Sequence, residues 1–520
     1  MKILNCLIVI AVTCAVAAPI AARAQDLLST EILTDCFVEM PGNAAPNGGT
    51  DCGYVVVPQS HSNPADGQIR LAYMRIRAAT QTTAPPLFML AGGPGQTMIQ
   101  DSTLLLFQTP FLGPLLNDRD VILMEQRGTF RSKPRLDCPE TDGAALGAIR
   151  QGLTPEVAKA SELDLLRACV ARHTAAGVDF DTYNNVESAA DVNDVRMALG
   201  YEKIFVYGSS YATLLGQYLL RQFPDYLSAV ILDGADTVSN RSWIEGRAES
   251  AQWGIDNLTG LCSSQPGCAE AFDIPTLIDA VFDLFDEGPI PISFALPDDD
   301  GAPIQVETEL TAEDFAQFIY ALQTEKYGVS ALPFELDSLI SGGRAAIGEA
   351  LTGYAMATVQ GGDTEGASGM MTLMHAAMVC SDDPVRSLDE IKTDGTGRYA
   401  TLFAQAAARP YLDLCEVVGV SQLPDDLDAQ VEADVPVLIL SGGLDVQTPS
   451  YLGDDVMRHL PRARQVIFPA GTHVQISNLN RCAMQVMRDF ISDPEGNVDL
   501  GCVADEQPLA FALPEATDAD

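Results

Sequence analysis

Short, continuous runs of apolar residues alternate with helical segments along much of this chain. The runs lie at 86–91, 121–124, 203–207, 230–232 and 435–440, and the first three are each followed closely by glycine. Strands that are apolar along their whole length are buried on both faces, and their alternation with helices is typical of a parallel sheet. The pattern therefore predicts an α/β fold with a mostly parallel central sheet and helices on both faces.

Two further regions extend this prediction. Residues 54–57 and 69–76 have strand patterns and are separated by a turn-rich stretch, which predicts an opening hairpin. Before the last apolar run, connectors rich in Gly, Pro and Asp separate helical segments such as 312–324 and 330–341. We interpret this long region as a helical insertion that caps the sheet.

The charge balance excludes one large class of functions. The 520 residues include 30 Lys and Arg against 71 Asp and Glu, which gives a net charge of −41. A surface this acidic repels phosphate backbones and anionic lipid headgroups. Nucleic acid is therefore not an expected partner.

The first residues have the layout of a cleavable secretory signal. Lys2 precedes an apolar run at 3–18, which is followed by Pro19 and by the small-residue pattern of 22–24. We expect cleavage after Ala24. An uncleaved membrane anchor is the alternative, against which Pro19 and the small residues argue. No later stretch reaches the roughly 18 apolar residues of a membrane helix, so the predicted mature protein is periplasmic or secreted and is not inserted in the membrane.

The cysteines fit an oxidising compartment. The 12 cysteines include Cys6 and Cys14 of the predicted signal, and the even number that remains implies disulfides. The sequence does not select one set of pairs, and the simplest guess joins neighbours along the chain. With 5 His and no Cys-x-x-Cys or His-x-x-x-His spacing, we expect no zinc site. We also expect no organic cofactor.

One apolar run leads directly into a candidate nucleophile. Residues 203–207 are followed by Gly208-Ser209-Ser210-Tyr211-Ala212, and a helical pattern begins at Thr213. A strand, a sharp turn and a helix form the nucleophile elbow of hydrolases, in which small residues at both ends allow the strained turn. We predict Ser210 as the nucleophile, although Ser and Gly are also common in ordinary turns.

A serine nucleophile needs a base, and the base needs a carboxylate that orients it. The run at 435–440 is followed by Asp445, and a later strand pattern at 465–468 leads to His473. The order Ser210, Asp445, His473 is that of the α/β-hydrolases. The other histidines lack this placement, and we interpret His61, His173, His375 and His459 as structural.

An acyl-transfer site also needs backbone donors for an oxyanion. The segment Gly92-Gly93-Pro94-Gly95 follows an early strand, and its glycines allow close approach to a substrate carbonyl. We assign the donors to the amides of Gly93 and Tyr211, the second of which follows the nucleophile. A plain Gly-Pro turn is the alternative interpretation of this segment.

Together these motifs resemble the prolyl aminopeptidase and tripeptidyl aminopeptidase branch of the α/β-hydrolases. That family carries a His-Gly-Gly-Pro-Gly loop, an Asp-Gln-Arg-Gly-Thr segment, a Gly-x-Ser-Tyr-Gly elbow, an Asp-x-x-Thr-Pro segment and a Gly-x-x-His or similar end. The corresponding residues here are 91–95, 125–129, 208–212, 445–449 and 471–473. The resemblance extends from about residue 50 to Cys502.

Further residues carry the resemblance or depart from it. Cys380-Ser381-Asp382 resembles a Cys-x-Asp of the secreted tripeptidyl type, and Cys482 with Cys502 resembles its C-terminal cysteine pair. The departures are Ala91 for His, Glu125 for Asp, Ala212 for Gly, and Val417 in place of an aromatic residue. None of them removes a member of the Ser-His-Asp set.

The resemblance implies an α/β-hydrolase fold in five parts. These are a signal peptide (1–24), the first part of the core (25–235), an inserted helical cap (236–430), the C-terminal part of the core with Asp and His (431–505), and a tail (506–520).

The implied function is a secreted serine aminopeptidase that releases residues or short peptides from free N-termini through an acyl-enzyme. Its partners would be peptide substrates, and the sequence does not give the oligomeric state. A carboxylesterase or lipase on the same triad, and a noncatalytic peptide-binding protein on this fold, are the alternatives. Cap acids could bind the substrate ammonium, and the candidates are Glu245, Glu249, Glu307 and Glu325.

Overall fold

The computed structural model describes six stretches of the chain, which are 28–39, 49–239, 244–297, 302–361, 369–382 and 384–514. The predicted signal peptide and the last residues of the predicted tail, 515–520, lie outside these stretches.

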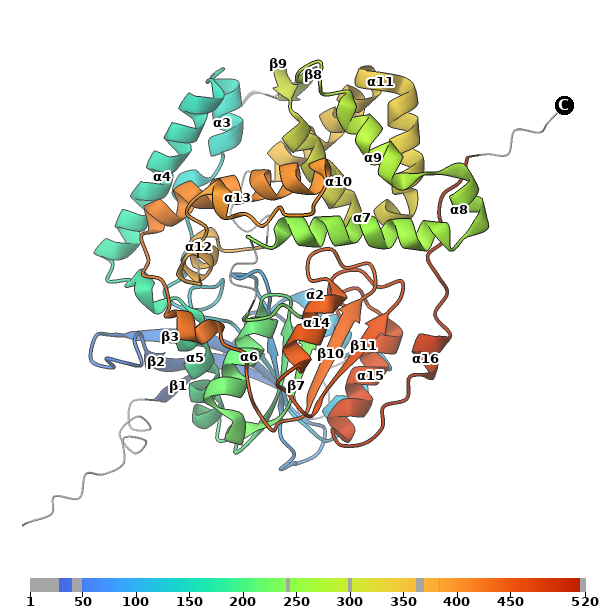
Figure 1. Cartoon of the computed structure of the whole chain (residues 1–520). Helices are drawn as coiled ribbons and strands as arrows, with labels where there is room; N and C mark the ends of the chain where they lie inside the picture. The colour runs from blue at the N-terminus through green and yellow to red at the C-terminus, as the bar shows by residue number, and fades with distance from the viewer. Residues whose placement is uncertain are drawn as a thin grey trace, which may run out of the picture.

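A nine-stranded sheet forms the core, with strand order β1-β2-β3-β5-β4-β6-β7-β10-β11 (Figure 1). The strands are β1 (Ser29–Ile32), β2 (Thr50–Pro58), β3 (Gln68–Ile76), β4 (Leu87–Leu90), β5 (Val121–Met124), β6 (Ile204–Ser209), β7 (Leu227–Asp233), β10 (Val437–Gly442) and β11 (Ala463–Phe468). The first three pair antiparallel, as does β3 with β5, and every pair from β5 to β11 is parallel. The predicted hairpin and the mostly parallel sheet are confirmed.

The central strands are buried along their whole length. All residues of β4, β5, β6 and β10 are buried. Along β4, Leu87 and Met89 join one hydrophobic cluster, whereas Phe88 and Leu90 join the other. Because successive side chains of a strand point to opposite faces, the sheet is covered by apolar residues on both sides.

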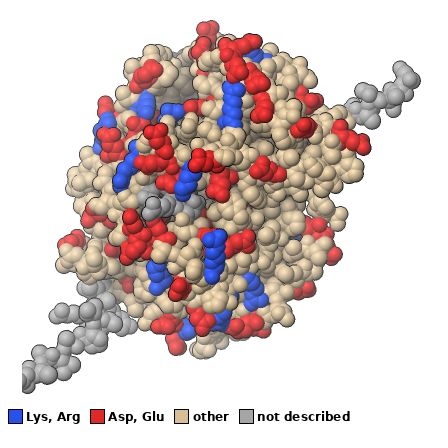
Figure 2. Space-filling view, in the orientation of Figure 1, with Lys and Arg blue, Asp and Glu red and all other residues tan. Residues whose placement is uncertain are grey.

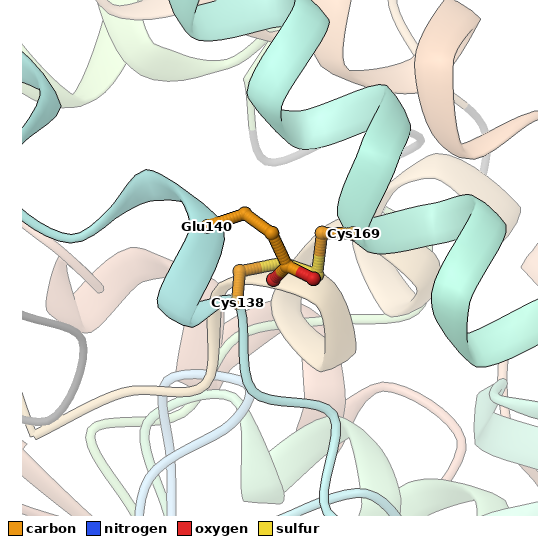
Figure 3. Close-up of side chains that lie close together, drawn as sticks. All are labelled: Cys138, Glu140 and Cys169. Atoms are coloured by element: carbon orange, nitrogen blue, oxygen red, sulfur yellow. A yellow bond between two sulfur atoms is a disulfide. The ribbon is translucent and has the colours of Figure 1, made fainter.

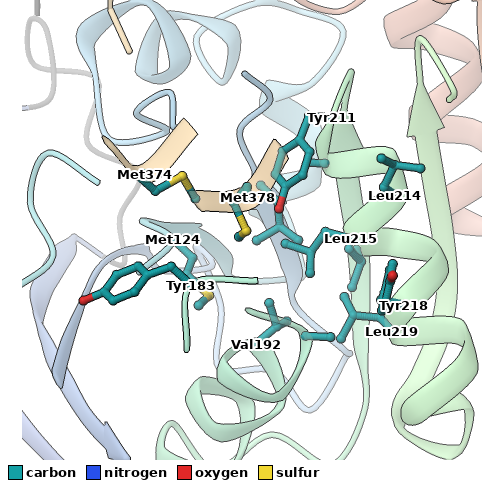
Figure 4. Packing of buried hydrophobic residues seen from close by; sticks show 14 of the residues in the cluster. Met124, Tyr183, Val192, Tyr211, Leu214, Leu215, Tyr218, Leu219, Met374 and Met378 are labelled. Atoms are coloured by element: carbon teal, nitrogen blue, oxygen red, sulfur yellow. The ribbon is translucent and has the colours of Figure 1, made fainter. Parts of the chain in front are cut away.

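Helices supply these two layers. The face of Phe88 is covered by α5 (Asn185–Ala198), α6 (Ala212–Gln222) and α14 (Ser450–Met457), and the face of Leu87 by α2 (Asp101–Leu106) and α15 (Arg481–Ser492). Figure 4 shows how Leu215 and Leu219 of α6 lie near Val192 of α5 in the first layer. This arrangement fixes the strand ends on which the candidate site is built.

A large cap lies between β7 and β10, above the end of the sheet to which β10 and β11 point (Figure 1). Its elements are α7 (Arg247–Ser263), α8 (Pro266–Ala271), α9 (Ile274–Asp283), β8 (Ile290–Pro297), β9 (Pro303–Leu310), α10 (Ala312–Gln323), α11 (Lys326–Gly361), α12 (Thr372–Ser381) and α13 (Arg398–Val418). It has a hydrophobic cluster of its own, which includes Phe282, Phe315 and Phe403. The helical insertion is confirmed, and the antiparallel pair β8–β9 is an addition that the sequence pattern did not predict.

Two helices from the first part of the chain also lie in the cap layer. These are α3 (Ala144–Arg150) and α4 (Pro155–Ala175) (Figure 1). Arg150 of α3 donates to the Pro297 carbonyl at 2.8 Å, and Lys159 of α4 lies 2.5 Å from the carboxylate of Asp413 on α13. The cap layer therefore draws on two separate parts of the sequence, while the domain boundaries given above remain a prediction.

Five disulfides join cysteines that are neighbours along the chain. The pairs are Cys36–Cys52, Cys138–Cys169, Cys262–Cys268, Cys380–Cys415 and Cys482–Cys502. Neighbour pairing is thus confirmed, including the pair between residues 482 and 502. Across the described stretches, every helix is too short or too polar to cross a membrane.

Acidic side chains are spread over both the cap and the core. Figure 2 shows them across the cap and the core on the visible face, with fewer Lys and Arg between them. This distribution agrees with the net charge of −41 and leaves no broad basic surface on that face.

Candidate active site

Ser210 lies in a strained turn between β6 and α6. Its φ is 52°, in the left-handed region that residues with a side chain rarely adopt. Its amide donates to the Asp233 carbonyl at 2.8 Å, which holds the turn against β7. Position 208 must be glycine, because a Cβ there would lie 2.3 Å from the Ala212 carbonyl oxygen. The predicted strand, turn and helix are therefore present around Ser210.

Asp445 and His473 form a buried pair. Asp445 follows β10 and is 1% exposed, and its Oδ2 lies 2.8 Å from Nδ1 of His473, in the loop after β11. The amides of Gln447 and Thr448 donate to its Oδ1 at 2.9 and 3.0 Å. Because the carboxylate can only accept, His473 carries its proton on Nδ1, which leaves Nε2 to act as a base.

Burial lowers the pKa of His473. The charge and the hydrogen bond of Asp445 raise this pKa by more than burial lowers it, so the net shift is upward.

Thr448 contacts both members of the pair. Its hydroxyl lies 2.7 Å from Oδ2 of Asp445 and 3.1 Å from Nδ1 of His473. Thr448 belongs to the predicted Asp-x-x-Thr-Pro segment, but its contact with the pair was not predicted.

Asp233, at the end of β7, connects the serine turn to the histidine loop. It is fully buried, and its carboxylate accepts from the amides of Gln475 at 2.8 Å and Ile476 at 2.9 Å. Burial raises the pKa of this carboxyl to about 6. Asp233 was not predicted as a site residue. An acidic residue that ends an apolar run directly before a glycine is a pattern that could have identified it.

The glycine loop after β4 lies against the serine turn. A Cβ on Gly92 would lie 2.9 Å from the Cβ of Ser210, so the two backbones approach closely. Gly93 has φ 111°. Among the hydrogen bonds of the described stretches, none has the amide of Gly93 or Tyr211 as its donor. Both amides can therefore donate to a substrate oxygen.

Residues after β5 support this loop. The side-chain amide of Gln126 donates to the Ala91 carbonyl at 2.7 Å. Glu125 accepts from the amide of Ile99 at 3.2 Å and from the hydroxyl of Thr97. Glu125, which stands where the family has Asp, therefore holds the chain just beyond the glycine loop.

Other candidates lie away from this cluster. Glu245 pairs with Lys392 at 3.1 Å, and the other three proposed cap acids, Glu249, Glu307 and Glu325, are exposed. In the part of the chain that the structure describes, none of the four contacts Ser210, Asp445 or His473. The structure thus does not select an acid for a substrate ammonium.

Three of the remaining histidines contact groups outside the cluster. His61 pairs with Glu187 and Asp194, His173 lies 2.8 Å from the Asp137 carbonyl, and His459 lies 3.7 Å from Glu432. His375 is different, because its ring contacts the glycine loop at the Pro94 carbonyl.

One group of side chains has the composition of a metal site. Cys138, Glu140 and Cys169 lie together (Figure 3). The two sulfur atoms are joined in a disulfide, and Glu140 accepts from Arg172 at 2.5 Å. Thiolates are the form in which cysteine binds metals, so this bonded pair serves to tie α4 to the segment after β5.

Two family matches cover separate parts of the chain. Residues 85–271 match the family described as alpha/beta hydrolase fold, and residues 399–502 match the family described as TAP-like protein.

Curated relatives match at lower identity. Serine protease Hip1 of Mycobacterium tuberculosis is 29% identical over 49% of this chain and 49% of that protein. The tripeptidyl aminopeptidase of Streptomyces coelicolor is 26% identical over 38% of this chain and 37% of that protein. The matched region thus spans about half the length of these relatives or less. A proline iminopeptidase structure from Mycobacterium smegmatis covers 85% of this chain and 98% of its own at 16% identity, with a TM-score of 0.36.

Proposed function

The chain is an α/β hydrolase with a TAP-like C-terminal region, and from this premise we propose that it is an exported serine aminopeptidase with Ser210 as its nucleophile. One observation carries the proposal. A buried Asp445–His473 pair, joined at 2.8 Å, follows β10 and β11, and in the sheet order only β7 separates these two strands from β6, which leads into the serine turn. An aspartate that orients a histidine in this way supports a Ser-His-Asp hydrolase.

In the proposed mechanism, Ser210 Oγ attacks the scissile carbonyl and its proton passes to Nε2 of His473. Asp445 fixes the Nδ1–H tautomer and stabilises the imidazolium that forms. The amides of Gly93 and Tyr211 donate to the oxyanion. Such hydrogen bonds stabilise the oxyanion most where water is excluded.

His473 then returns the proton to the leaving amine, and an acyl-enzyme on Ser210 remains. Water attacks the acyl-enzyme with His473 again as base, and the free serine is restored. All steps use side chains and amides of this chain.

One observation supports a peptide substrate. The matched relatives are a serine protease and a tripeptidyl aminopeptidase. A cavity of about 600 Å³ lies between α4, α10 and α13, but neither Ser210 nor His473 lines it, so it does not support a particular substrate.

Export is supported by the five disulfides, since such bonds persist in oxidising compartments. We propose that residues 1–24 direct the chain to the periplasm or the exterior and are removed after Ala24. N-terminal sequencing of the mature protein tests this proposal.

Two experiments test the activity. A fluorophosphonate probe should label the wild-type protein at Ser210 and leave Ser210→Ala unlabelled, whereas an unlabelled wild type would favour the noncatalytic alternative. The second experiment compares peptides that have a free N-terminus with their N-acetylated forms and with short-chain esters.

Acetylation removes a charge-assisted hydrogen bond, which is typically worth about 1.5 to 3 kcal/mol. We expect kcat/KM to fall at least about tenfold on acetylated peptides. Equal rates on free and acetylated peptides would reject the aminopeptidase, and fast turnover of esters alone would favour the esterase.

A further inference from the structure

The cap helix α12 contacts the glycine loop of the core directly. Nδ1 of His375 lies 3.1 Å from the Pro94 carbonyl oxygen, and the amide of Met371 donates to the Gly95 carbonyl at 3.0 Å. The next residue, Gln96, forms an isolated antiparallel bridge with Met370. The three residues after Gly93 are thus held by the cap.

The glycine loop and α12 are tightly packed at this contact. A Cβ on Gly95 would lie 2.9 Å from the Met371 carbonyl oxygen, so the two backbones are already in close contact. His375 itself is 6% exposed. Figure 4 shows Met378 of the same helix next to Tyr211, the residue after Ser210. Helix α12 therefore packs against both segments that carry the proposed oxyanion donors.

The protonation state of His375 follows from its two partners. The Pro94 carbonyl can only accept, so the ring donates from Nδ1, and Nε2 accepts from the hydroxyl of Tyr411 at 2.7 Å. Burial lowers the pKa of His375 to about 4, which keeps the ring neutral near pH 7. Tyr411 belongs to α13, and a disulfide between Cys380 and Cys415 joins α12 to that helix. The imidazole is thus fixed from both sides.

We propose that His375 is a positioning residue for the oxyanion hole, in which its Nδ1–H holds the Pro94 carbonyl and so fixes the loop that carries the Gly93 amide. The proposal rests on the proposed function of Ser210 and Gly93. Its consequence is that the cap takes part in assembling the catalytic geometry as well as enclosing the substrate. A misplacement of about 1 Å in such a site can reduce the rate by about 10²-fold.

The test uses three variants and one matched control. His375→Leu removes the donor. His375→Asn places an amide nitrogen near the position of Nδ1, and His375→Gln places it near that of Nε2. His173→Leu is the control, because His173 is also buried and also lies within hydrogen-bond distance of a carbonyl, at 2.8 Å from Asp137.

The measured quantities are the second-order rate of fluorophosphonate labelling at Ser210, kcat and KM on a free-amine peptide, and Tm. We expect His375→Leu and His375→Gln to lower labelling and kcat about 10- to 100-fold with little change in KM. His375→Asn should restore most of the rate, and His173→Leu should lower Tm while the labelling rate stays at the wild-type value.

The outcomes separate the two proposals. If the wild-type protein is not labelled, the proposed function fails. If the wild type is labelled and the Asn and Gln variants react at equal rates, the positioning role of His375 is rejected while the function of Ser210 stands. This comparison holds even if His375→Leu does not fold, since both amide variants keep a polar group at the buried position.

Discussion

The core and the cap of this molecule are stabilised in different ways. Strands β4, β5 and β10 are buried at every residue and lie between two apolar layers. In the cap, β8 alternates buried and exposed residues along its whole length, and its buried face packs against α3 and α11. The core sheet is thus buried on both faces, whereas the small sheet of the cap is buried on one face only.

The two regions meet at a few defined contacts. Besides α12 on the glycine loop, Asn257 of α7 donates to the Gly443 carbonyl at 2.7 Å, and Tyr320 of α10 donates to the Val446 carbonyl at 3.3 Å. Both carbonyls flank Asp445 closely in sequence. The core thus carries the proposed reacting groups, while the cap contacts the loops on which those groups stand.

The largest expected effect is confined to the core. Ser210→Ala should lower kcat roughly 10⁶-fold without a change in Tm, because His473 and Asp445 act only through that hydroxyl. Steady-state assays and thermal melts measure both quantities. Ser209→Ala is the control and should be mild, since the hydroxyl of Ser209 makes a weak 3.5 Å contact to the Leu90 carbonyl and takes no part in the proposed mechanism. An inactive Ser209 variant beside an active Ser210 variant would show that the elbow assignment is wrong.

Truncating one large side chain in each region tests whether they unfold separately. Phe88 in the core and Phe315 in the cap are both fully buried, and replacement of either by Ala should cost about 3 to 5 kcal/mol. Phe88→Ala should lower the temperature at which Ser210 labelling is lost. Phe315→Ala should abolish peptide hydrolysis at a lower temperature than labelling by the small probe, which slows but continues because the core still holds Ser210. Loss of labelling in both variants at the same temperature would mean that core and cap unfold as one unit.

The disulfides offer a smaller comparison. Cys482–Cys502 closes a loop with a sequence separation of 20 beside the core, and Cys262–Cys268 closes one of 6 in the cap. In the chain-entropy model their removal as Ser pairs should cost about 3 and about 2 kcal/mol. Calorimetry under non-reducing conditions measures both losses. A greater loss for the cap pair would show that loop length does not govern the effect.

The smallest expected effect concerns pH. The reaction needs Nε2 of His473 unprotonated, so kcat/KM is high above its pKa and falls about tenfold per pH unit below it. Asp233 raises this pKa through its charge. Asp233→Asn should therefore lower the pKa of His473 and move the acidic limb of the profile to lower pH.

The control for this profile is Tyr207→Phe. It removes the 2.8 Å hydrogen bond to the Asp233 carboxylate and keeps the carboxyl group. Because this hydrogen bond lowers the pKa of Asp233, its loss should move the acidic limb in the same direction as Asp233→Asn but less far. A limb that moves to higher pH in Asp233→Asn would contradict the electrostatic assignment.

Most of the core could be predicted from the sequence. Apolar runs bounded by glycine gave the central strands to within a few residues, and the ends of three of them led to Ser210, Asp445 and His473. These features depend on local patterns and on the rule that parallel strands present their carboxyl ends at one edge of the sheet. The sequence did not select one set of cysteine pairs, but the simplest guess, which joins neighbours along the chain, is confirmed.

The cap could be predicted only in outline. The alternation of β8 is visible in the sequence, but Pro291 and Pro297 within it oppose a strand assignment. His375 lies in a helix whose local pattern shows no sign of its contact with Pro94, which is distant in sequence. Such contacts depend on how separate elements pack, and a local pattern contains no information on that packing.

The position of the cap in the chain has a consequence for biosynthesis. Ser210 is translated before the inserted cap elements α7 to α13, whereas Asp445 and His473 are translated after them. Domains fold in order as the chain emerges from the ribosome, so a growing chain has the proposed nucleophile long before it has the base. The unfinished protein is therefore unable to cleave the peptides around it, and the proposed activity begins only when the last strands of the sheet have been made.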